Sequence, residues 1–97
     1  MNYTVYKYPL SRGLNHLMLP RDADLLSARV QDQKSPMPIT LWALVYPDAP
    51  IETRYVFVVG TGYPVPAPKK ARYVTTIQAD GEQSVWHVFD FGTEPPL

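Results

Sequence analysis

The stretch Gly60-Thr61-Gly62 could bind a phosphate, because two glycines follow an apolar run and precede Lys69 and Lys70. A phosphate-binding loop of that type needs a helix directly after its glycines, since the helix N-terminus supplies the aligned amide groups that hold the phosphate. The prolines that forbid this helix are Pro64, Pro66 and Pro68. We therefore expect a strand that ends at the glycines, where glycine allows a bulge or a positive φ, and then a stiff, proline-rich loop that projects over residues 63–70.

The basic cluster of the chain, Lys69, Lys70 and Arg72, closes this loop. Lysine and arginine neutralise phosphates and tyrosine stacks on bases, so the cluster and the nearby Tyr63 could contact a phosphate or an acidic partner. The alternative is a solvated loop whose charges discourage edge-to-edge pairing, and so few charges on a neutral protein favour it. The candidate partner-binding residues are Tyr63, Pro64, Pro66, Pro68, Lys69, Lys70 and Arg72.

The two histidines do not indicate catalysis. His87 lies in an expected strand, and Asp90, three residues later, should point to the opposite face, so the two cannot act as a catalytic pair. A cross-strand hydroxyl such as that of Thr76 is another partner for His87. His16 has no adjacent acid. With two histidines and no cysteine, we expect no catalytic residue, no metal site and no cofactor.

The composition narrows the function classes further. Nine basic and nine acidic residues leave no net charge, which argues against nucleic acid or an acidic membrane as the partner. A chain of 97 residues fits one domain, residues 1–97. Its first residues lack the basic and apolar regions of a signal peptide, and no apolar run approaches the roughly 18 residues of a membrane span. We therefore expect a protein of the cytoplasm, or one assembled there.

Eleven prolines and seven tyrosines indicate an all-β protein, because proline breaks helices whereas tyrosine suits a half-buried sheet surface. Leu26, Ala28 and Val30 alternate with polar residues, and Ile39–Tyr46 is apolar on both faces, as in a central strand. Pro47-Asp48-Ala49-Pro50 predicts a turn. The expected strands cover residues 4–8, 14–19, 26–30, 39–46, 55–59, 72–79 and 82–89. About seven short strands predict a small antiparallel barrel or sandwich with little or no helix.

Asp80-Gly81 predicts a two-residue hairpin turn between the last two strands, because a type I′ turn needs positive φ at both positions. That turn would pair Ile77 with Ser84 and Thr75 with Trp86. The register then places these side chains on one face: Tyr73, Ile77, Trp86 and Val88.

Several blocks of the sequence carry a resemblance: K-Y-P-L at 7–10, L-W-A-L-V at 41–45, P-D-A-P at 47–50, G-T-G at 60–62 and V-W-H-V-F at 85–89. Together and in this order they resemble a family of small proteins encoded by bacteriophages and prophages, a domain of unknown function. The resemblance spans most of the chain and implies a phage setting. It implies no catalytic residue.

The chain has more tyrosine and tryptophan residues than one small core can bury, because each buried side chain of these types needs a hydrogen-bond partner. Exposed tyrosines beside a proline-rich loop suit contact with another protein, although tyrosines can also simply cover the half-exposed faces of strands.

We therefore expect a non-enzymatic phage protein that acts through protein–protein contacts. The expected role is a small virion component, such as a head-decorating or minor structural protein, found in the virion or the host cytoplasm. Its partners would be other phage structural proteins or a host protein, and a homo-oligomer is compatible with the sequence. The alternatives are an early phage protein that inhibits a host enzyme or defence system, and a nucleotide-binding sponge.

Overall fold

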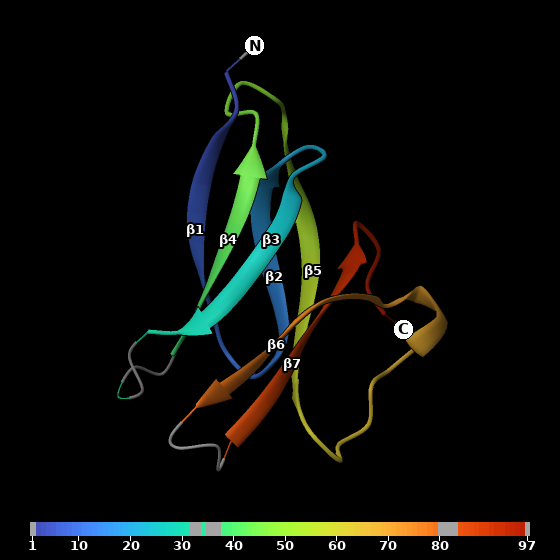
Figure 1. Ribbon diagram of the computed structural model, residues 1–97. Helices are drawn as coiled ribbons and strands as arrows, with labels where there is room; N and C mark the ends of the chain where they lie inside the picture. The colour runs from blue at the N-terminus through green and yellow to red at the C-terminus, as the bar shows by residue number, and fades with distance from the viewer. Residues whose placement is uncertain (1, 32–33, 35–37, 80–83, 97) are drawn as a thin grey trace.

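Two antiparallel β-sheets pack face to face in the computed structural model, which describes residues 2–31, 34, 38–79 and 84–96 (Figure 1). The strands are β1 (Thr4–Leu10), β2 (Gly13–Pro20), β3 (Asp24–Val30), β4 (Ile39–Val45), β5 (Ile51–Gly60), β6 (Arg72–Ala79) and β7 (Ser84–Gly92). A single turn of 3-10 helix, η1 (Pro68–Lys70), precedes β6. The expected all-β fold of about seven strands is confirmed.

One sheet has the strand order β1-β4-β3 and the other the order β2-β5-β7-β6, with every pairing antiparallel. The chain passes from one sheet to the other between β1 and β2, and returns between β2 and β3. β3 and β6 lie side by side where the sheets meet. The sheets do not close into a barrel, so of the two expected architectures the sandwich is the one adopted.

The core lies between the sheets. Its fully buried large side chains are Leu10, Leu19, Ile39, Leu41, Val45, Val56, Val58 and Val88. Along β4 every second residue is buried and the others are half-buried, which matches its position between β1 and β3 and confirms the expected central strand.

Several strand ends differ from expectation, and those of β1 and β5 have a clear local reason. β1 continues through Pro9 to Leu10 instead of stopping at Tyr8, because β1 is an edge strand and an edge tolerates a residue without an N–H group. β5 begins at Ile51, directly after the turn predicted at residues 47–50, which is closed by a hydrogen bond from the Ala49 N–H to the Tyr46 carbonyl (3.0 Å).

A β-bulge changes the inward side of β3. The pairing with β4 shifts between Leu25 and Ser27, so Leu26 is an extra residue and is 45% exposed. Leu25 instead packs against the core beside Ala28 and Val30. The expectation that Leu26, Ala28 and Val30 share the buried face is therefore wrong at Leu26.

The β6–β7 hairpin exists, but the predicted register is wrong. Ile77 pairs with Trp86 and Ala79 with Ser84, two positions beyond the pairing that a turn at Asp80-Gly81 requires. The turn itself lies outside the described residues. A second bulge, between Tyr73 and Thr75, also turns Tyr73 out of the core.

Candidate functional site

The loop between β5 and β6 begins with a tight turn. The Tyr63 N–H donates to the Gly60 carbonyl and the Thr61 N–H to the Val85 carbonyl, each over 3.2 Å. Gly62 has a φ of 93°, which only glycine adopts readily. The expected strand end with positive φ is thus confirmed. No helix follows these glycines directly, since η1 starts only at Pro68 and has three residues.

The loop carries the candidate partner-binding residues to different places. Tyr63 and Pro64 line a hollow at the end of β5, whereas Lys70 and Arg72 line a charged cleft. Lys69 and Pro68 are exposed in η1, and Pro66 is half-buried. η1 also makes the end of the loop a helical turn, where a polyproline-like conformation was expected through to residue 70. The sequence cluster is therefore not one site in the structure.

The hollow that holds Tyr63, which we call the Gly60 hollow, measures about 400 Å³. Arg12 and Trp86 line it together with Tyr63 and Pro64. The Arg12 guanidinium carbon lies 4.3 Å from the centroid of the Trp86 ring, a cation–π contact. Tyr63 is 74% exposed.

Arg12 reaches this hollow because a buried asparagine holds the connection between β1 and β2. The Asn15 side chain accepts a hydrogen bond from the Ser11 N–H (2.9 Å) and donates to the carbonyls of Ser11 (2.9 Å), Gly13 (3.1 Å) and Val56 (3.2 Å). The connection is thereby fixed to β5, and Arg12 with it.

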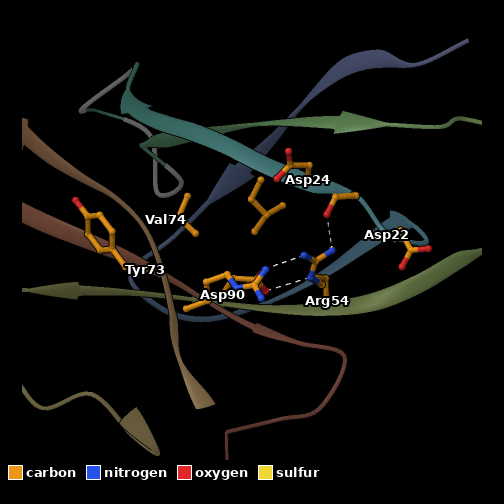
Figure 2. Close-up of a pocket in the computed structure, with 9 residues that line it drawn as sticks. Asp22, Asp24, Arg54, Tyr73, Val74 and Asp90 are labelled. Atoms are coloured by element: carbon orange, nitrogen blue, oxygen red, sulfur yellow. Dashed lines mark hydrogen bonds and ion pairs between the residues drawn. The ribbon is translucent and has the colours of Figure 1, made fainter. Parts of the chain in front are cut away.

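The charged cleft lies between β3 and the β6–β7 pair (Figure 2). In Figure 2 the side chains of Arg54 and Asp90 face one another between Asp22 and Asp24 on one side and Tyr73 and Val74 on the other. The cleft comprises two adjoining hollows of about 350 and 330 Å³, which share Asp22, Arg54, Arg72 and Asp90.

Arg54 and Asp90 neutralise one another and use one another's hydrogen-bonding groups, so the ion pair at the floor of this cleft acts as a structural lock that holds strands together. Arg54 donates from Nε and Nη2 to the two carboxylate oxygens of Asp90 (3.1 and 2.7 Å) and from Nη1 to the Ala23 carbonyl (2.9 Å). Asp90 also accepts from the Gly92 N–H (2.8 Å). Charges of both signs line the remainder, which suits no single charged ligand.

The outer face of the four-stranded sheet carries a chain of hydrogen-bonded hydroxyls around His87. Nε2 of His87 lies 2.7 Å from the Thr61 hydroxyl and Nδ1 lies 3.1 Å from that of Thr76, which contacts the Tyr73 hydroxyl at 2.8 Å. The expected cross-strand partner Thr76 is confirmed. Asp90 lies on the inner face, so this carboxylate does not orient the histidine.

A row of apolar side chains crosses the same face, one from each strand. The strand registers place Leu14 opposite Phe57, Phe57 opposite Phe89, and Phe89 opposite Tyr73. The Tyr73 and Phe89 rings meet edge to face, 6.1 Å apart. We call these four residues the apolar row. Its two ends, Leu14 and Tyr73, are 37% and 58% exposed.

The described residues contain neither a metal-binding cluster nor a helix that could cross a membrane. No three His, Cys, Asp or Glu side chains of residues 2–31, 34, 38–79 and 84–96 come together as a set that could hold a metal ion. In the same part of the chain, no helix has both the length and the apolar character needed to cross a bilayer.

A family model described as a domain of unknown function, DUF7352, matches residues 1–95. The chain belongs to the DUF7352 family. No curated protein and no solved structure matches it. This result agrees with the expectation, based on the sequence blocks, that the chain belongs to a family of unknown function.

The sequence identified two of the residues that line the Gly60 hollow of this DUF7352 domain, Tyr63 and Pro64, and missed the charged one. Arg12 lies about fifty positions earlier, in a connection with no motif of its own. The single available signal is Asn15, a polar residue among the alternating apolar residues of β2, which is 6% exposed. A buried asparagine must find hydrogen-bond partners, and here it finds them in the segment that carries Arg12.

Proposed function

We propose that this protein is a bacteriophage-encoded, non-enzymatic protein that acts by binding another protein. Its partner is a phage structural protein, and its role is that of a small virion component, a head-decorating or minor structural protein. The phage setting rests on the resemblance of the sequence blocks, and the virion or the host cytoplasm is its location.

The apolar row carries the proposal. The outer face of a two-layer sandwich is normally polar, because it is in contact with water. Here every strand of the larger sheet contributes an apolar side chain to one row, and the exposed Met18 (60%) and Ile51 (56%) extend the face along β2 and β5. Exposed apolar groups gathered on one face mark protein-interaction sites, and aromatic side chains supply rigid contact area.

The non-enzymatic part of the proposal rests on His87. Its ring has hydroxyl groups on both nitrogens, where a general base that activates a nucleophile would have a carboxylate or similar group to orient it. Arg54 and Asp90, a buried pair of charged groups in close contact, already bind one another.

Mass spectrometry of purified virions of the encoding phage tests the role. The protein should be present in stoichiometric amounts, and its absence from particles would contradict the proposal. Tyr73→Ser tests the face, because Tyr73 ends the apolar row. Tyr3→Ser is the matched control, since Tyr3 is also 58% exposed but lies beside β1 in the other sheet. Particle occupancy should fall for Tyr73→Ser alone.

A further inference from the structure

The Gly60 hollow has an open aromatic wall. The turn that closes on the Gly60 carbonyl folds Tyr63 back over Gly60, and Trp86 lies beside the same glycine. A Cβ atom on Gly60 would lie 3.3 Å from the Trp86 ring and 3.4 Å from the Tyr63 ring. The missing side chain thus lets both rings approach the backbone, while most of the Tyr63 ring stays in contact with solvent.

The hollow also carries a positive charge, that of Arg12. Apart from its contact with the Trp86 ring, the Arg12 side chain makes no hydrogen bond or ion pair with any residue in the described part of the chain. Among these described residues, no carboxylate lines the hollow. A guanidinium stacked on a ring keeps its N–H donors at its edge, where they can bind an anion.

The end of the strand pairing leaves this hollow accessible. β2 begins at Gly13 opposite Val58, so the last two residues of β5, Val59 and Gly60, lie beyond the end of β2. The volume of about 400 Å³ falls within the range of small-molecule sites, roughly 300–1,000 Å³.

We propose that the Gly60 hollow binds a nucleoside monophosphate, with the base stacked on Tyr63 and the phosphate on Arg12. Aromatic rings recognise the face of a base, and arginine recognises phosphate with paired donors. One arginine matches one phosphate, and a neutral protein lacks the charge to follow a nucleic-acid strand. The site differs from the glycine loop with basic cluster considered in the sequence, because Lys69, Lys70 and Arg72 lie outside it. The proposal does not depend on the protein partner of the apolar row.

NMR titration with AMP, adenosine and inorganic phosphate tests the proposal on the intact protein. AMP should bind more tightly than either fragment and shift the indole N–H signal of Trp86 but not that of Trp42. Tyr63→Ala should weaken AMP binding about 5- to 150-fold, the range expected for loss of one stacking partner. Arg12→Gln should abolish the preference for AMP over adenosine, because adenosine lacks the phosphate.

Tyr73→Ala and Arg29→Gln are the matched controls, since both change an exposed residue of the same type away from the hollow and should leave AMP affinity unchanged. Titration with short oligothymidylates of increasing length distinguishes a free nucleotide from one within a strand. Affinity that rises with length would show that the hollow recognises single-stranded nucleic acid and would overturn the assignment to a free nucleoside monophosphate. No saturable binding tighter than about 1 mM, or AMP and adenosine binding equally to the wild-type protein, would overturn the proposal. Either result would leave the Tyr73→Ser test of virion binding unaffected.

Discussion

Arg54 of β5 and Asp90 of β7 form a two-point ion pair beneath the charged cleft, with distances of 3.1 Å from Nε to Oδ1 and 2.7 Å from Nη2 to Oδ2. Their side chains are only 13% and 7% exposed. The third arm of Arg54 binds the carbonyl of Ala23, in the turn between β2 and β3. One arginine therefore links two strands of the larger sheet to the connection that leads into the smaller one.

Removal of one partner of this pair should strongly destabilise the protein. Arg54→Met leaves the Asp90 carboxylate buried without its cation, and an uncompensated buried charge costs about 3–5 kcal/mol. Urea unfolding followed by far-ultraviolet circular dichroism measures the loss. The double variant Arg54→Met/Asp90→Leu should recover much of it, because neither charge then remains. If Arg54→Met alone unfolds within about 1 kcal/mol of the wild type, the ion pair is not the lock described.

Replacement of Asn15 should loosen the connection between β1 and β2. Asn15→Ala removes the side chain that satisfies the Ser11, Gly13 and Val56 carbonyls, and each unsatisfied buried polar group costs about 1–3 kcal/mol. Urea unfolding should show this loss, and the Trp86 indole signal should move as Arg12 shifts. The neighbouring His16 is exposed and its ring meets that of Tyr55 at 5.0 Å, so His16→Ala should cost about 1 kcal/mol and leave the Trp86 signal in place. Equal effects of the two substitutions would refute the role given to Asn15.

Alanine substitutions at Gly60, which ends β5, and at Gly62, in the loop that follows, should perturb the protein for different physical reasons. Gly62→Ala adds a methyl group into open space but retains a φ of 93°, so it should cost about 1–2 kcal/mol in backbone strain. Gly60→Ala instead pushes against the Trp86 and Tyr63 rings. Two-dimensional NMR should therefore show a displaced Trp86 signal for Gly60→Ala, and an unchanged one for Gly62→Ala. The opposite pattern would contradict the contacts described for Gly60.

Ionisation of the Tyr8 phenol should be linked to folding. Burial against the core raises the pKa of Tyr8 above its ordinary value of 10.0, and the nearby Tyr6 raises it further. The folded state therefore favours the neutral phenol. This contribution to stability is fully present below pH 10 and is lost as the pH rises through the higher pKa of the folded state.

Ultraviolet difference titration of phenolate formation measures this shift. Tyr8→Phe should remove a tyrosine that ionises above the ordinary range, and Tyr6→Phe should lower the pKa of Tyr8. If Tyr8→Phe removes no phenol that ionises above the ordinary value of 10.0, the shift is absent.

Local patterns in the sequence are sufficient to predict where the strands lie, but not which residues of neighbouring strands pair. The apolar run of β4 and the turn at residues 47–50 can be recognised from a few consecutive residues, because they depend on local conformational preference and on period-two alternation. The bulges at Leu26 and Val74 do not, since each depends on which neighbour the facing strand offers. The register of β6 on β7 differs from the predicted one by two residues already at Ala79 and Ser84, next to the connection, although both strands are recognised.

The candidate sites, like the strands, were predictable only where their residues are close together in the sequence. Tyr63 is visible in the sequence as an aromatic residue beside glycines and prolines, but its neighbours Arg12 and Trp86 come from other parts of the chain. The apolar row likewise joins four strands through their registers. The candidate residues of the β5–β6 loop show the converse case, because adjacency in sequence suggests one site, whereas Tyr63 and Pro64 line the Gly60 hollow and Lys70 and Arg72 line the charged cleft.

Composition, proline placement and alternation act within a few residues, and they are enough to predict a small, neutral, all-β fold in which no helix directly follows the glycines of Gly60-Thr61-Gly62. The sandwich arrangement of the sheets, the ion pair of Arg54 with Asp90, and the hollow that Arg12 and Tyr63 both line appear in the folded structure alone. Those contacts depend on strand order, register and bulges, which are selected by how all the side chains pack together and not by any one segment.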